Sequence, residues 1–171
     1  MNKSPIRNQE EIDQFVEGEK LAQGYMDIEY HLRGYQIINR NGNRARDLLI
    51  AIDGQEYKVE EKFRSSDYGD FLVEILQCMI TKEVGWFYKT KADILAYVIC
   101  KDWKPYHFYL VDWRKFPQWF NGYLLQNKSP KCRISSRGIG LTLNLAISWG
   151  SIPDNIYERF EATYEENLDQ D

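Results

Sequence analysis

The chain has 171 residues, of which 43% are hydrophobic, 28% charged and 15% aromatic, and its net charge is -4. This composition excludes disordered, collagen-like and membrane proteins, and the length fits a single domain over residues 1–171. The sequence has no apolar signal-peptide core and no apolar run near the roughly 20 residues of a membrane span. We therefore expect a cytoplasmic protein with no membrane contact.

The predicted elements form a helix, three strands, a second helix, two strands and a mixed tail. Apolar residues at helical spacing predict helices from about residue 8 to 33 and over 70–83. The turn signal Asp53-Gly54 predicts a hairpin between strands 46–52 and 56–64. The remaining elements are a strand over 35–40, strands over 93–100 and 107–113, a helix near 114–126, a basic loop, a strand over 141–147 and an acidic terminal helix. This order indicates an α/β domain with a mixed central sheet flanked by helices.

The hairpin register places two carboxylates opposite one another. If Asp53 and Gly54 are the loop residues, Asp47 faces Glu60 on one side of the strand pair. Facing carboxylates repel, and a hard divalent cation would offset that repulsion. Lys62 lies on the same side as Glu60, where its ammonium can approach a phosphate or a metal-bound water. The alternative is a solvated strand end in which Lys62 neutralises Glu60.

Two other carboxylates need partners. Glu61 points to the opposite side of its strand, where the same register places Arg46, so a cross-strand ion pair is predicted. Glu19 falls on the apolar stripe of the first helix, so we expect it to be paired, protonated or bound to a cation. The alternative for Glu19 is a carboxylate at the edge of the stripe, in contact with solvent or a basic residue.

Three segments in this order resemble the PD-(D/E)xK nuclease superfamily, in its resolvase-like branch. They are GEKLAQGYM at 18–26, GYQIINRNGNRARDLLI at 34–50 and YKVEEKF at 57–63. The resemblance covers about residues 10–112 and implies a restriction-endonuclease-like core of helix, three strands, helix and two strands. Residues 114–171 would then be a C-terminal extension. The sequence departs from the family pattern at Arg46, where a proline is common, and at Glu61, where a hydrophobic residue is common.

The resemblance implies a Mg²⁺- or Mn²⁺-dependent endodeoxyribonuclease that acts on structured or branched DNA, in a family where homodimers are common. The implied catalytic residues are Glu19, Asp47, Glu60 and Lys62. The implied metal ligands are Asp47, Glu60 and the backbone carbonyl of Glu61, with Glu19 acting through water. Candidate phosphate-positioning residues are Arg33, Arg40, Arg44, Arg46, Arg64, Lys89 and Lys91. The alternatives are a non-catalytic nucleic-acid-binding or assembly protein on the same fold, and a nuclease that acts on RNA.

Overall fold

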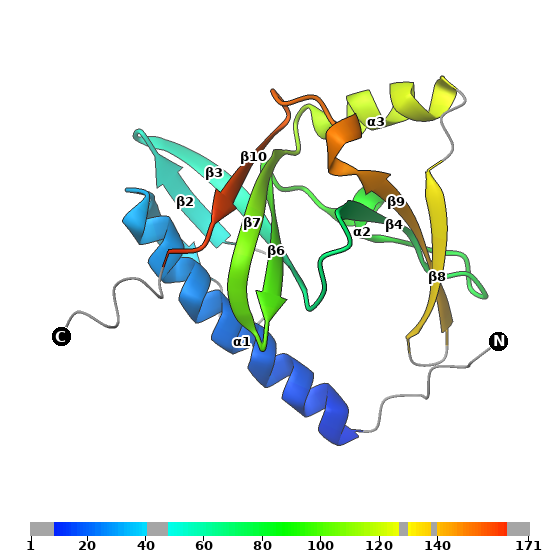
Figure 1. The fold of residues 1–171 in the computed structure, drawn as a ribbon, viewed down its shortest axis with the longest axis horizontal. Helices are drawn as coiled ribbons and strands as arrows, with labels where there is room; N and C mark the ends of the chain where they lie inside the picture. Colours follow the sequence, from blue (N-terminus) through cyan, green and yellow to red (C-terminus); the bar gives the residue numbers. More distant parts are fainter. Residues whose placement is uncertain (1–8, 41–47, 127–129, 138–139, 164–171) are drawn as a thin grey trace. The chain divides into compact units, whose positions relative to one another are not determined.

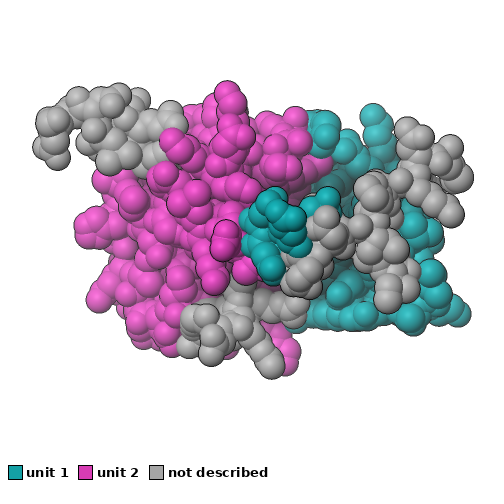
Figure 2. Space-filling view, turned by 90° about the horizontal axis from the view of Figure 1, so that it is seen from below, with its two compact units in different colours: residues 1–15, 68–90, 118–153 teal, residues 16–67, 91–117, 154–171 magenta. Residues whose placement is uncertain are grey.

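The fold is described from a computed structural model, which covers residues 9–40, 48–126, 130–137 and 140–163. The chain divides into two compact units, which Figure 2 distinguishes by colour. The six-stranded unit contains residues 16–67, 91–117 and 154–171, and the four-stranded unit contains residues 1–15, 68–90 and 118–153. Each unit is named here for the sheet that its described residues form.

The sheet of the six-stranded unit has the strand order β1-β2-β3-β6-β7-β10. Its strands are β1 (Gln36–Arg40), β2 (Leu48–Ile52), β3 (Gln55–Arg64), β6 (Ile94–Lys101), β7 (Lys104–Asp112) and β10 (Tyr157–Glu161). Strands β3 and β6 run parallel, and the other neighbours run antiparallel. The predicted α/β class with a mixed sheet is therefore confirmed.

Helix α1 (Gln9–Leu32) belongs to this unit from residue 16 onward, and that part packs on one face of this sheet (Figure 1). Ala22, Met26 and Tyr30 are fully buried and repeat at intervals of four residues, so they form one stripe along the helix. They belong to the same apolar core as Val59 of β3 and Val98 of β6. The predicted first helix is thus confirmed, and it fixes which face of β3 is apolar.

A close contact joins α1 to the turn between β6 and β7. Gly18 lies against the indole of Trp103, and a Cβ atom at residue 18 would overlap that ring. Trp103 follows Asp102, and both have the left-handed backbone conformation of a type I′ turn, with φ of +64° and +52°. The missing side chain at Gly18 is therefore what lets the Trp103 ring pack on the helix.

We expect Gly18→Ala to lower the free energy of unfolding by about 1–3 kcal/mol, because the indole must shift to admit the methyl group. Gly24→Ala is the matched control in the same helix, since nothing lies within 4 Å of a Cβ atom there. That control should gain about 0.5–1 kcal/mol from helix propensity. Urea unfolding of both variants tests the contact, and equal stability of the two would contradict it.

The sheet of the four-stranded unit is antiparallel, with the order β5-β4-β9-β8. Its strands are β4 (Asp70–Cys78), β5 (Glu83–Val84), β8 (Lys131–Arg137) and β9 (Gly140–Ser148). The short helices are α2 (Trp86–Lys89), α3 (Phe116–Leu125), which begins in the other unit, and the 3-10 helix η1 (Trp149–Ser151). Phe71 packs against Trp86 and Trp149 with ring centroids 6.2 and 5.1 Å apart. No helix among the described residues is long and apolar enough to span a membrane.

Three predicted elements differ in the structure. The expected helix over 70–83 is replaced by strand β4, because Phe71, Val73 and Ile75 suit a strand and β4 pairs with β9. The expected basic loop contains strand β8, which pairs with the other side of β9. The prediction of an acidic terminal helix is also wrong for residues 157–161, which form strand β10 and pair with β7.

All three cysteines are free thiols, and their surroundings differ. Cys100 is buried, and its burial raises the pKa of that thiol to about 12. Hydrogen bonds with Thr81 lower the pKa of Cys78, and Cys132 is exposed. At about pH 8 we expect Cys78 and Cys132 to react with a disulfide reagent and Cys100 to react only after denaturation. Rapid reaction of all three thiols in the folded protein would contradict this assignment.

Candidate active site on strand β3

The β2–β3 hairpin has the predicted register. Leu48 pairs with Val59, and the turn residues Asp53 and Gly54 have φ of +51° and +79°. Both central residues of a type I′ turn need positive φ, which explains the Asp-Gly sequence. Asp47, the predicted partner of Glu60, lies outside the described residues.

Glu60 and Lys62 form an ion pair on the face of the sheet opposite α1. Lys62 Nζ lies 2.6 Å from Glu60 Oε1, and the side chains are 27% and 7% exposed. The parallel neighbour β6 places Leu95 beside Glu60 and Tyr97 beside Lys62. Because Leu95 and Tyr97 are buried, the pair lies in a poorly solvated setting where charges interact strongly.

Glu61 lies on the α1 side of the same strand and is bound by Arg40. Arg40 Nη1 donates to Glu61 Oε2 at 2.7 Å and Nη2 to Oε1 at 3.1 Å, and the same guanidinium contacts Asp27 of α1. Burial raises the pKa of Glu61, although Arg40 opposes that effect. The ion-pair partner of Glu61 in the structure is thus Arg40, whereas the predicted partner Arg46 lies outside the described residues.

The structure does not bring Glu19 to Glu60. Helix α1 packs on the Glu61 side of the sheet, and Asp27 is the helix residue that shares Arg40 with Glu61. Glu19 lies eight residues before Asp27, or about 12 Å of helix, beside Gly18 and its contact with Trp103. Within the ranges that the structure describes, no group of three or more His, Cys, Asp and Glu side chains could hold a metal.

Two of the predicted phosphate-positioning residues are ion-paired within the six-stranded unit. Arg33 pairs with the buried Glu29 and lies over the rings of Phe108 and Phe160, at 4.8 and 4.9 Å from their centroids. Arg40 is shared by Asp27 and Glu61, as described above. Both guanidinium groups therefore have a structural role.

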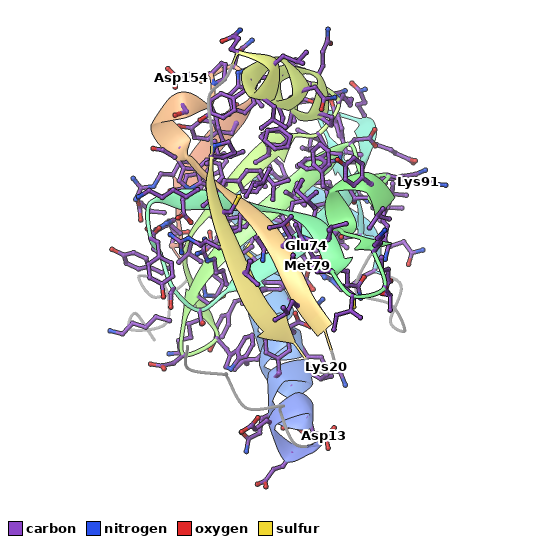
Figure 3. The ribbon with its side chains drawn as sticks, turned by 90° about the vertical axis from the view of Figure 1, so that its right-hand side faces the viewer. Asp13, Lys20, Glu74, Met79, Lys91 and Asp154 are labelled. Atoms are coloured by element: carbon purple, nitrogen blue, oxygen red, sulfur yellow. The ribbon has the colours of Figure 1, made fainter. Side chains whose placement is uncertain are left out.

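The other predicted cations lie in different settings. Lys89 pairs with Glu83 at 2.7 Å in the four-stranded unit. Lys91 is exposed, and its side chain points outward in Figure 3. Arg64 lies on the Glu60 side of β3, where its Nη1 donates to the Tyr97 hydroxyl at 2.8 Å. Arg44 and Arg46 lie outside the described residues.

Sequence reasoning missed Tyr97, which lies in the centre of this face. It occupies the position on β6 beside Lys62 and is 3% exposed. Its strand was predicted, but the parallel pairing of β6 with β3 carries no local sequence signal. Tyr97 could be found only once the sheet order was known.

Comparison with protein-family models, with curated proteins and with solved structures gives no match. Because there is no match, the class of this protein is defined by its fold and its site alone. It is an α/β protein with a mixed sheet whose third strand carries a Glu-Lys ion pair with a buried carboxylate.

Proposed function

We propose that this protein is a metal-dependent nuclease that hydrolyses DNA phosphodiester bonds, with a restriction-endonuclease-like core. The observation that carries the proposal is the Glu60–Lys62 pair, a buried carboxylate in contact with an ammonium on one face of β3. The order of elements supports it in part: a helix and three antiparallel strands precede a strand parallel to β3, but strand β4 replaces the second helix expected over residues 70–83.

The proposed ligands are of the chemical kind that holds a hard divalent cation. Such ions prefer carboxylate and carbonyl oxygens, which Glu60, Asp47 and the backbone of Glu61 would supply. When bound, Mg²⁺ or Mn²⁺ supplies positive charge that stabilises the scissile phosphate, and it lowers the pKa of a bound water. Lys62 would donate to a phosphate oxygen or orient the attacking water, and the poorly solvated surroundings strengthen that interaction. Glu19 is not part of the proposed site.

The proposal is tested with purified protein and three DNA probes: a supercoiled plasmid, a four-way junction and single-stranded DNA. We expect cleavage with Mg²⁺ or Mn²⁺ and none with EDTA. Glu60→Gln protein, purified in parallel, shows whether a contaminating nuclease is responsible. If no DNA probe is cleaved with either metal, the proposal fails. DNA binding without cleavage would then favour the non-catalytic alternative, and cleavage of RNA alone would change the substrate.

A further inference from the structure

We propose that a groove between the end of helix α1 and strand β1 binds an extended segment of a partner protein. The segment would add a strand to the six-stranded sheet and place a lysine or arginine side chain in the groove. This inference goes beyond the proposed nuclease function and does not depend on it. Every residue that lines the groove belongs to the six-stranded unit.

The groove lies where the last turns of α1 face the start of β1, and its volume is about 520 Å³. Its lining residues are Asp27 and His31 of the helix, Gly34 and Tyr35 of the connection, and Gln36 and Ile37 of the strand. Pockets of roughly 300–1,000 Å³ hold whole small ligands, so this groove is large enough for one long side chain.

Strand β1 is the edge strand on this side of the sheet. It pairs with β2, and no described strand lies on its other side. Alternate residues of an antiparallel strand direct their N–H and C=O groups away from the partner, where an added strand can pair with them. Natural edges are protected by bulges, prolines and outward charges. β1 has a bulge after Ile37 but no proline, and its one charged residue, Arg40, turns inward to Asp27 and Glu61.

The ion pairs beside the groove leave an excess of negative charge. Asp27, whose side chain is 37% exposed, shares the guanidinium of Arg40 with Glu61. Two carboxylates thus face one cation, and Asp27 is the one that lines the groove. A cationic side chain in the groove would restore the balance of charge.

Tyr35 lies in the same negative surroundings. Burial raises the pKa of Tyr35, and the carboxylates of Glu158 and Asp53 raise it further, whereas Arg33 lowers it. Arg33 is itself paired with the buried Glu29. The charges around the groove therefore favour lysine or arginine over an acidic side chain in a bound segment.

The first test uses the full-length protein and a library of random nine-residue peptides displayed on phage. We expect the selected peptides to share a lysine or arginine among β-branched or aromatic residues, which favour strands. Calorimetry then gives the Kd of one synthetic selected peptide. N-Methyl groups on one alternate set of its amides should weaken binding about tenfold or more, and those on the other set should not, because only one set faces β1.

Charge variants of His31 test the groove itself. His31→Glu should bind the selected peptide about fivefold more tightly at low salt and His31→Lys about fivefold more weakly, the size of one exposed ion pair. A peptide with glutamate in place of its basic residue should reverse this order. Lys20→Gln is the matched control, because it changes the net charge by the same unit as His31→Glu, with histidine neutral. Lys20 is exposed on α1 about 16 Å from His31, so its variant should leave Kd unchanged.

Thermal unfolding checks that the variants fold. Selection of no peptide, or a Kd that is the same for wild type, His31→Glu and His31→Lys, overturns the proposal. Equal effects of the two N-methyl sets overturn the added strand. Analytical ultracentrifugation of the protein alone tests a second copy as the occupant, and a dimer that His31→Lys weakens would overturn the assignment to a partner protein. None of these results depends on DNA cleavage, which tests the nuclease proposal separately.

Discussion

Arg40→Met is expected to lower the free energy of unfolding by about 3–5 kcal/mol near neutral pH, because it leaves a buried carboxylate without its cation. The side chain of Glu61 is only 3% exposed, and Arg40 binds both of its oxygens. The same substitution removes the partner of Asp27 on α1. Chemical denaturation of the variant and the wild type measures the loss.

The loss should depend on pH with a defined sign. Burial raises the pKa of Glu61 above its ordinary value, so the folded state binds this proton more tightly than the unfolded chain. The resulting stabilisation is present at low pH and is lost as the pH rises through the folded pKa. Without Arg40 that pKa rises further, so the deficit of Arg40→Met should shrink as the pH falls from neutral into the acid range.

A double variant separates the charge from the packing. Arg40→Met combined with Glu61→Leu removes both charges and should recover most of the lost stability. Arg114→Met is a surface control, because the Arg114 side chain is 52% exposed and its partner Asp112 also pairs with Lys115, so little change is expected. A deficit that is the same at every pH, or a double variant no better than Arg40→Met, would contradict a buried charge as the cause.

Glu60→Gln and Lys62→Met should each lower the rate of metal-dependent DNA cleavage by about 10²–10³-fold or more. Glutamine keeps the shape of Glu60 but loses the charge that would hold a metal, and methionine keeps the length of Lys62 without its ammonium. Single-turnover rates measure the effect. Thermal unfolding must show that both variants fold, since each leaves one charge of a partly buried pair.

The chain supplies a control for this result. Glu56 and Lys58 repeat the Glu-x-Lys spacing on the same strand, but both side chains are exposed. Glu56→Gln and Lys58→Met should cleave DNA like the wild type. Equal losses at both pairs, or full activity of Glu60→Gln, would reject Glu60 and Lys62 as the catalytic pair.

The elements that were predicted correctly are those whose structure depends on residues close together in the sequence. The hairpin follows from Asp53-Gly54, whose backbone conformation selects the turn, and α1 follows from a regular apolar stripe. Strand β4 was missed because the apolar residues of 70–78 fit a helical stripe and a buried strand equally well. The deciding contact is the pairing of Phe71 with Ile147 of β9, far along the chain.

Within the candidate site, the sequence predicted only the directions of the side chains along strand β3. Alternation correctly separated Glu60 and Lys62 from Glu61, since it depends on one strand alone. The pairing rule for two strands could not reveal Arg40, which extends from β1 past β2 to reach Glu61 on β3. Arginine side chains are long enough to cross a strand, so their partners are not limited to the residues that face them on the neighbouring strand.

The six-stranded sheet is completed by a strand from the far end of the chain. Strand β10 pairs with β7 only after residues 118–153, which belong to the other unit, have been synthesised. A nascent chain on the ribosome would therefore carry β7 with one backbone edge unpaired, and such edges promote aggregation. Non-local pairing of this kind also slows folding. Cellular yield of this protein should thus depend on how well that edge is protected during the interval before β10 emerges.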